Sequence, residues 1–409
     1  MATRNPAIRS RAATRGKKGA KTTGRGRTVA LHMGHPAVLL GVTTGLLVLL
    51  GLVMILSASS VTSFANYGSS FLFFRRQLLW AALGLVGFFL MARMDYRKLH
   101  RLGLPAVILS GLMLMAVLMP GVGVLVGGSS RWIALGPLSF QPSEFAKLGL
   151  ILFAAEVFSR KKEVTFEDLS HTFLPLIPAL GFLVFLVMMQ PDLGTTMVLG
   201  FIGFGMLFVA GAPLRHLIPM GVIGTGLSLI AALAEDYRRA RILAFLDPWK
   251  DPLNTGYQTI QSLIALGSGG WVGVGLGASR QKWMYVPNAH TDFIFAILGE
   301  EMGLVGTFVV VLMFAFIAYL GVRTAQRAPD RFGMLVASGI TIWISIQALV
   351  NMGAVTASLP ITGVPLPLVS FGGSSLVICL IAMGILVNIA KQGRFAKPAS
   401  KERSARKQK

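Results

Sequence analysis

The chain has 409 residues, of which 54% are hydrophobic and only 13% are charged, and its mean hydropathy is +0.69. Soluble domains carry about 25% charged residues, so this composition excludes a water-soluble globular protein and indicates that lipid surrounds much of the chain. The formal net charge is +22.

The two ends of the chain carry 16 of these net charges. Residues 1–35 contain nine Lys/Arg and no acid, and residues 391–409 contain eight Lys/Arg and one acid. Such segments have little apolar surface to bury, so we expect disordered tails at 1–35 and 392–409. Gly-Arg-Gly-Arg at 24–27 invites a nucleic-acid interpretation, but cytoplasmic tails that contact anionic membrane lipids account for the charge. No nucleic-acid partner is expected.

Ten apolar stretches predict membrane-spanning helices, because a helix needs about 20 apolar residues to cross the hydrocarbon core. The first is read as a retained span, since the basic region before it is too long for a signal peptide and its apolar run has the full length of a span. The fold class is an all-α polytopic membrane domain over 36–391. Its spans are expected near 37–57, 77–94, 102–120, 143–158, 170–189, 193–211, 215–234, 292–322, 332–353 and 366–390.

Basic residues in the short loops predict that both termini are cytoplasmic. The predicted inner loops hold Arg93, Arg97, Lys98, Arg101, Arg160, Lys161, Lys162, Arg215, Arg323, Arg327 and Arg331. The large outer loop at 235–291 departs from this bias, since Arg238, Arg239, Arg241, Lys250, Arg280 and Lys282 would face outward. A bound anion would explain these outward cations.

Polar residues collect where the predicted fourth span begins on the outer side. Arg131 and Trp132 are interpreted as part of the rim of a binding site, and Gln141 shortly precedes Glu144 and Lys147. The acid and the lysine are three residues apart, so they share one helix face and can pair. They form either a structural ion pair between helices or the wall of a polar cavity.

Two further acids lie at predicted helix starts on the same side. Asp192, in the tight turn Gln-Pro-Asp, is either a helix N-cap or part of the cavity. Asp292 follows a cationic, aromatic stretch that includes Lys282 and His290. We expect the following helix to keep its carboxylate ionised and able to accept a proton, although an acid at such a position is most often a simple cap.

Two outer segments predict backbone that is not regular helix. The stretch 267–277 contains too much glycine for a stable span and is expected to be a re-entrant or surface loop. The stretch 351–375, which includes Ser370, combines prolines and glycines. At membrane depth, such backbone is tolerated only where it lines protein or a water-filled cavity.

These motifs together resemble the SEDS family (shape, elongation, division and sporulation), which includes FtsW, RodA and SpoVE. The similarity covers about residues 37–391, and it is carried by four stretches. They are RWIALGPLSFQPSEFAK at 131–147, GYQTIQSLIALGSGG at 256–270, VGLGASRQKWMYVPNAHTDFIFAILGEEMG at 274–303 and NMGAVTASLPITGVPLPLVSFGGSS at 351–375. Ala357, Ser358 and Phe371 depart from the residues common in the family. The basic N-terminal tail, PGVG at 120–123 and GLGASRQK favour the FtsW branch.

The resemblance implies a peptidoglycan glycosyltransferase that polymerises lipid II at the outer face of the bacterial cytoplasmic membrane, for septal wall synthesis in cell division. Asp292 matches the family's essential acid and is the expected general base. Arg131, Trp132, Gln141, Glu144, Lys147, Asp192, Lys282, His290 and Ser370 are expected to bind substrate. Expected partners are a class B penicillin-binding protein, which is a transpeptidase, and other divisome proteins.

No cofactor is expected, because the sequence has no Asp-x-Asp pair and no Cys/His cluster with zinc spacing. The sequence leaves open whether Asp292 alone binds a metal ion. Three other functions compete with a septal polymerase: a lipid II flippase, a RodA-type elongation polymerase, and a scaffold whose buried charges are only structural. The sequence contains no convincing internal repeat, and this disfavours the flippase.

Overall fold

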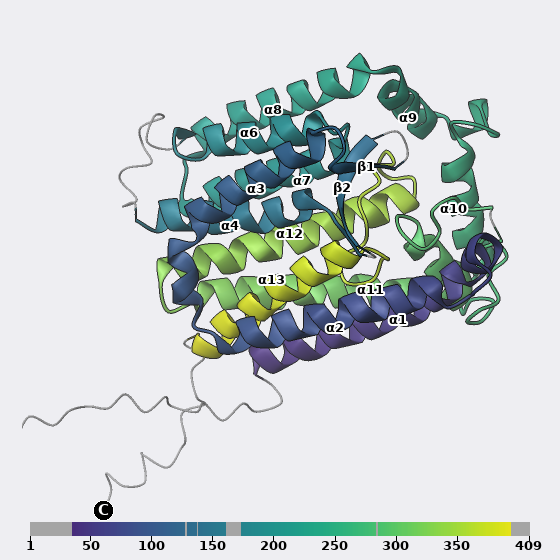
Figure 1. The fold of residues 1–409 in the computed structure, drawn as a ribbon, viewed down its shortest axis with the longest axis horizontal. Coiled ribbons are helices and arrows are strands. Elements are labelled where there is room, and N and C mark those ends of the chain that lie inside the picture. Colours follow the sequence, from purple (N-terminus) through teal and green to yellow (C-terminus); the bar gives the residue numbers. More distant parts are fainter. Residues whose placement is uncertain (1–34, 127–128, 137, 161–172, 284, 394–409) are drawn as a thin grey trace, which may run out of the picture. The chain divides into compact units, whose positions relative to one another are not determined.

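The computed structural model describes residues 35–126, 129–136, 138–160, 173–283 and 285–393. Within these ranges, a helix occupies each of the ten predicted stretches (Figure 1). They are α1 (Pro36–Tyr67), α2 (Leu72–Arg93), α3 (Gly103–Leu118), α4 (Pro142–Ser159), α6 (Ile177–Met188), α7 (Leu193–Ala210), α8 (Leu214–Ala234), α11 (Ile294–Gln326), α12 (Arg331–Val355) and α13 (Gly373–Gln392). The predicted tails lie almost wholly outside the described residues, as does the start of the fifth stretch.

Length and hydropathy divide these ten helices into three groups. Seven are long and apolar enough to cross a membrane, and α3 and α6 are shorter apolar helices. α4 is 18 residues long but carries Glu144, Lys147 and Glu156 among its apolar residues. The helical, multi-pass character predicted from hydropathy is therefore confirmed in the described part of the chain.

Local sequence signals define several helix ends. His35 caps α1 by accepting a hydrogen bond from the Ala37 amide, and α1 ends at Gly68, which adopts a left-handed conformation with φ of 68°. Asp330 caps α12, because its carboxylate accepts the Gly333 amide at 2.7 Å. Such caps satisfy backbone groups that the helix itself leaves unpaired.

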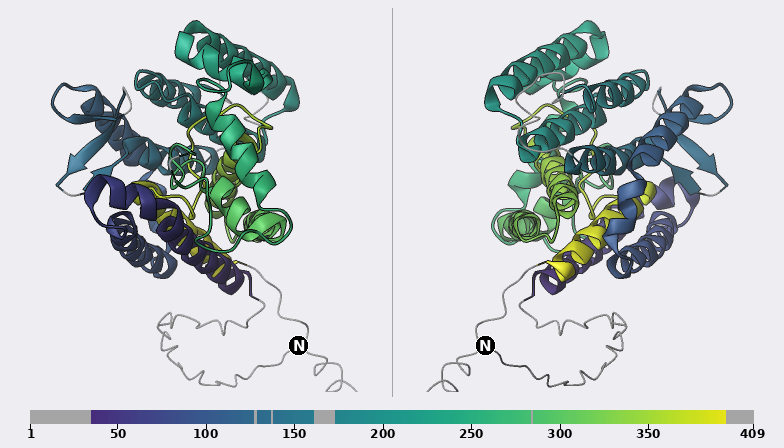
Figure 2. Two further views of the ribbon diagram at one scale, coloured as in Figure 1. Left: turned by 90° about the vertical axis from the view of Figure 1, so that its right-hand side faces the viewer. Right: turned by 90° about the vertical axis from the view of Figure 1, so that its left-hand side faces the viewer.

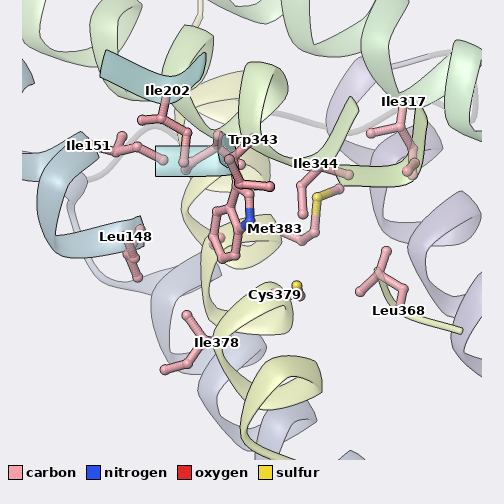
Figure 3. Packing of buried hydrophobic residues seen from close by; sticks show 14 of the residues in the cluster. Leu148, Ile151, Ile202, Ile317, Trp343, Ile344, Leu368, Ile378, Cys379 and Met383 are labelled. Carbon is pink, nitrogen blue, oxygen red and sulfur yellow. The ribbon is translucent and has the colours of Figure 1, made fainter. Parts of the chain in front are cut away.

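The core lies around α12 and α13. α13 packs against α2 and α1, and α12 packs against α11, α4 and α7. Trp343 of α12 and Cys379 of α13 are fully buried near Met383 and Ile151 (Figure 3). α8, by contrast, is the least buried of the long helices: it lies at the edge of the bundle (Figure 2), and only 11% of an 18-residue apolar stretch within it is buried. Lipid must therefore cover most of α8, whereas protein surrounds α13.

A small antiparallel sheet, which the sequence analysis did not predict, connects α3 to α4. Its strands lie in the order β1 (Gly123–Val126), β2 (Ser129–Leu135) and β3 (Leu138–Phe140). β2 pairs Trp132 with Val124, and Ile133 with both Gly123 and Phe140. These strands are too short to give a clear alternating pattern, but they fix the direction in which β2 presents Arg131 and Trp132.

The large outer loop contains helices of its own. They are α9 (Asp236–Leu246), η3 (Pro248–Lys250) and α10 (Tyr257–Ser268). In Figure 1, α9 and α10 lie at the same end of the bundle as the sheet. This is the end where α7 and α11 begin and α12 ends.

α11 is broken near its start. Gly303 has φ of 65° and ψ of −165°, which is backbone that only glycine adopts readily. The glycine-rich segment 267–277 packs around this break. The amides of Val274 and Gly275 donate to the carbonyls of Glu300 and Glu301 at 3.0 and 3.1 Å, and the Leu304 amide donates to Gly270 O at 2.9 Å. The loop therefore supplies the hydrogen bonds that the broken helix has lost.

The other end of the bundle collects the basic residues of the predicted inner loops, except Lys161 and Lys162, which lie outside the described residues. The 3-10 helix η1 (Tyr96–Arg101) joins α2 to α3 there. Its Tyr96 hydroxyl donates to Asp330 Oδ2 at 2.7 Å, next to the start of α12. Arg331 Nη2 donates to Ala210 O at the end of α7. The helix ends that were predicted to share the inner side of the membrane therefore lie at one end of the bundle.

Candidate active site

Asp292 lies between the outer loop and α11, where three segments meet. The Asn351 side-chain amide donates to Asp292 O and to Val364 O, both at 2.8 Å. The Ser370 hydroxyl donates to Thr291 O at 2.6 Å and accepts the Leu366 amide. The segment between α12 and α13 is thereby fixed against the residues that carry the acid.

Three charged side chains act on the Asp292 carboxyl. Arg241 of α9 and Arg131 of β2 favour its ionised form, and Asp192 at the start of α7 opposes it. Arg241 is also tied to the segment beside the acid, because its Nη1 donates to Ile361 O at 3.3 Å. Segments from four parts of the chain therefore place two cations and two acids around one position.

Burial decides the protonation of Asp292. The residue keeps part of its surface open, but desolvation outweighs the two arginines and raises the pKa of its carboxyl to about 7. Burial therefore opposes the ionisation that the following helix was expected to favour. The N-cap of α11 is Phe293, and no side-chain hydrogen bond caps the helix. An acid with a pKa near 7 is well suited to accept a proton at neutral pH.

Arg131 and Asp192 meet at the tight turn between α6 and α7. Arg131 donates from Nε to Gln190 O at 3.0 Å and from Nη2 to Pro191 O at 2.6 Å. Asp192 is the N-cap of α7, since its carboxylate accepts the amide and the hydroxyl of Thr195 at 3.0 and 2.9 Å. The N-cap interpretation of Asp192 is therefore confirmed. Its charge also acts on Asp292, and a role in the cavity stays a prediction. Trp132, next to Arg131 on β2, is partly exposed.

Glu144 and Lys147 form a buried ion pair with a separation of 2.8 Å. Lys147 also donates to Gln347 Oε1 of α12 at 2.7 Å, and the Ser375 hydroxyl of α13 donates to Glu144 at 3.0 Å. The amide of Gln141 donates to Ser374 Oγ at 3.1 Å. The pair thus joins α4, α12 and α13. This arrangement favours the structural interpretation, and a role in binding substrate stays a prediction.

Lys282 belongs to a second polar cluster. Its ammonium lies 3.7 Å from Glu301 Oε1 and donates to Gly277 O at 2.5 Å. Glu301 Oε1 also accepts the Ser57 hydroxyl of α1 at 2.5 Å. Glu300 accepts the Arg280 amide at 2.9 Å. Lys282 therefore neutralises a buried acid beside the break in α11, whereas the cations acting on Asp292 are Arg241 and Arg131.

His290 packs in an aromatic group just before the acid. Its ring lies 4.7 Å from that of Phe73 and 5.5 Å from that of Phe371, and its carbonyl accepts the Phe371 amide at 2.9 Å. Burial lowers the pKa of His290 to about 4, so the ring is neutral at pH 7. His290 and Ser370 thus hold loops together beside Asp292. Any contact that they make with substrate stays a prediction.

Asn351 and Gln347 were not selected from the sequence as site residues, and Arg241 was predicted only as one of six outward cations that a bound anion would explain. Arg241 lies among many loop cations, and nothing in its local pattern distinguishes it. Asn351 and Gln347 lie on α12, four residues and about one turn apart, and each fixes a segment distant in the sequence. Two amides at that spacing in a predicted span are a usable signal, since polar groups at membrane depth require partners. Among the described residues, no group of three or more His, Cys, Asp or Glu is placed to hold a metal ion.

Comparisons with known proteins show the family to which the chain belongs. The family model described as "Cell cycle protein", for FtsW, RodA and SpoVE, matches residues 37–395. This chain belongs to that family. It is 43% identical to Stage V sporulation protein E of Bacillus subtilis, over 88% of this chain and 98% of that protein. It is 42% identical to the probable peptidoglycan glycosyltransferase FtsW of Geobacter metallireducens, over 83% and 90%.

A solved structure of a peptidoglycan synthase complex, which coordinates polymerisation and crosslinking, contains a chain of the same fold. The TM-score is 0.71 at 32% identity, covering 86% of this chain and 96% of the other. The resemblance to the SEDS family, first drawn from motifs, is therefore confirmed by sequence and by fold.

Proposed function

We propose that this chain is a peptidoglycan glycosyltransferase that polymerises lipid II, with Asp292 as the general base. The observation that carries the proposal is the group around Asp292: an acid with a pKa of about 7 beside two arginines, on loops where the helices end. Membership of the family supports it, because relatives in this family carry the name peptidoglycan glycosyltransferase.

The reaction needs one proton acceptor and a way to stabilise a diphosphate. The 4-hydroxyl oxygen of the acceptor's N-acetylglucosamine attacks the anomeric carbon of the donor. The bond from that carbon to the diphosphate oxygen breaks, so the configuration inverts. Asp292 takes the proton of the attacking hydroxyl, and the lipid diphosphate leaves with the bonding electrons. A positioned base contributes about 10²- to 10⁴-fold to such a step.

Arg131 and Arg241 are the proposed partners of the leaving diphosphate. Both are near enough to act on Asp292, and a guanidinium can donate two parallel hydrogen bonds to a phosphate. Their backbone partners, Pro191 O and Ile361 O, hold them at the site. Arg241 is one of the outward cations that depart from the charge bias, and binding the diphosphate is its proposed role. Lys282 has no part in this proposal.

The proposed setting is the bacterial cytoplasmic membrane, with Asp292 on the outer side and synthesis at the division septum. The names FtsW and SpoVE among the relatives support the septal role over an elongation role. The similar synthase complex coordinates polymerisation with crosslinking, which supports a transpeptidase of the class B penicillin-binding type as partner. Other divisome proteins belong to the same proposal.

Purified protein with its partner transpeptidase, supplied with labelled lipid II in detergent, tests the assignment. Glycan polymer should form, and Asp292→Asn should reduce its rate by about 10²- to 10⁴-fold. Asp236→Asn is the matched control, because Asp236 is 93% exposed and pairs only with Arg239 in the described structure. Unchanged polymerisation by Asp292→Asn would refute the base. Failure to form polymer with any partner, together with transport of lipid II across vesicle membranes, would favour a flippase.

A further inference from the structure

A basic cavity lies at the end of the bundle opposite Asp292. It is formed by η1 and has a volume of about 520 Å³, and its lining residues are Arg97, Lys98, His100 and Arg101. Ligand sites in proteins commonly have volumes of about 300–1,000 Å³. No acid lines this cavity in the described part of the chain, so its chemistry favours an anion.

The backbone of η1 is held firmly, which makes the cavity a preformed site. Tyr96 and Leu99 are buried, and the Tyr96 hydroxyl bonds Asp330. The His100 ring lies 4.9 Å from Phe332 and within hydrogen-bond distance of Ser159. Tyr96 and His100 thus anchor η1 at the start of α12, and His100 also contacts α4, while the cations are exposed.

The charges of the cavity are only partly compensated. Arg97 pairs with Asp330 at 3.0 Å, and Asp95 also acts on it. Lys98 and Arg101 are exposed, and neither has a carboxylate within ion-pair distance among the described residues. Among the described residues, two cations are therefore available to an anionic ligand, and the paired Arg97 completes the wall.

Apolar residues follow the cavity directly. Leu102 is 47% exposed and Leu104 is 51% exposed at the start of α3, and Leu90 is 59% exposed on the last turns of α2. In a membrane these side chains face acyl chains. A molecule with phosphates at one end and hydrocarbon at the other fits both the basic cavity and the apolar surface beside it. A soluble phosphate fits only the basic cavity.

We propose that η1 and the first turn of α3 form a binding site for an anionic phospholipid. The phosphodiester lies among Lys98, Arg101 and Arg97, and the acyl chains lie along Leu102 and Leu104. Cardiolipin, with two phosphodiesters, matches the two uncompensated cations, and basic sites between membrane helices bind such headgroups. The site is separate from the lipid II site, because the two lie at opposite ends of α12 and α13.

Titration of the purified full-length chain with cardiolipin in neutral detergent, read by native mass spectrometry, tests the proposal. The double variant Lys98→Gln/Arg101→Gln should bind cardiolipin about 25-fold more weakly, about fivefold for each cation. The control, Arg215→Gln/Arg323→Gln, removes the same charge outside the cavity and should bind like the unmodified chain. The basic tails are present in every sample, so their contribution cancels.

Three further measurements make the result decisive. Lys98→Arg/Arg101→Lys should retain binding, and equal melting temperatures should show that the Gln variant is folded. Inorganic phosphate at millimolar concentration should not displace the lipid. The proposal fails if the control loses as much affinity as the cavity variant, if phosphatidylcholine binds as well as cardiolipin, or if inorganic phosphate competes fully, which would indicate a site for soluble phosphate.

Discussion

At the scale of single residues, the protonation of Asp292 depends on a balance between burial and three neighbouring charges. Burial raises the pKa of the carboxyl to about 7, the two arginines lower it, and Asp192 raises it. A base must be deprotonated to act. The polymerisation rate should therefore be low well below pH 7 and should rise as the pH increases through about 7.

Opposite changes to these neighbours should move the pH profile in opposite directions. Arg241→Gln removes a cation that stabilises the carboxylate, so the midpoint of the rate against pH should move to higher pH. Asp192→Asn removes an anion that destabilises it, so the midpoint should move to lower pH. Steady-state polymerisation rates from pH 5 to pH 9 measure both shifts. Shifts of the same sign, or none, would show that Asp292 is not the titrating base.

At the scale of elements, the pair of Glu144 and Lys147 joins α4 to α12 and α13. Lys147→Met leaves the Glu144 carboxylate buried without its cation, which should lower the unfolding free energy by about 3–5 kcal/mol. The double variant Glu144→Gln/Lys147→Met removes both charges and should recover much of this loss. Thermal unfolding in detergent gives the comparison. If the double variant binds lipid II as tightly as the unmodified chain, the pair is structural.

The break in α11 gives a second prediction at this scale. A Cβ at Gly303 would lie 2.4 Å from Gly273 N and 2.6 Å from Trp271 O, in backbone with φ of 65°. Gly303→Ala should therefore cost at least about 1–3 kcal/mol from backbone strain alone and should displace the glycine-rich segment. Gly200→Ala is the control, since nothing lies within 4 Å of a Cβ there. A melting temperature of Gly303→Ala equal to that of the control would contradict the role of the break.

At the scale of the whole molecule, the distribution of charge predicts orientation. Arg101 is the last residue of η1, and Asn254 lies between η3 and α10, at the other end of the bundle; both residues are exposed. With the buried Cys379 replaced by alanine, Arg101→Cys should react with a membrane-impermeant thiol reagent only after the cells are opened. Asn254→Cys should react in intact cells. The reverse pattern would place Asp292 in the cytoplasm and would exclude synthesis at the outer face.

The sequence predicted the helices better than it predicted the contacts among them. Hydropathy located the ten stretches, because the cost of exposing polar backbone to lipid leaves a strong and local signal. The three short strands and the role of Arg241 leave no such signal. The pairing of Lys147 with Gln347 spans 200 residues, and no local pattern encodes it. Asp292 could be identified from its motif. Its protonation could not, because it depends on burial, which only the folded chain shows.

The break at Gly303 has a consequence for membranes of different thickness. Residues 304–326 are long enough to cross a bilayer, and such a helix adapts to a thicker or thinner bilayer by changing its tilt. The short segment 294–302 begins two residues after Asp292. The glycine-rich loop bonds this segment at Glu300 and Glu301 and also bonds the first residues of the crossing helix, Leu304 and Val305. The loop therefore bridges the break, and a change in tilt of the crossing helix is passed on to the segment that follows the acid. We expect the geometry around Asp292 to respond to the thickness of the bilayer.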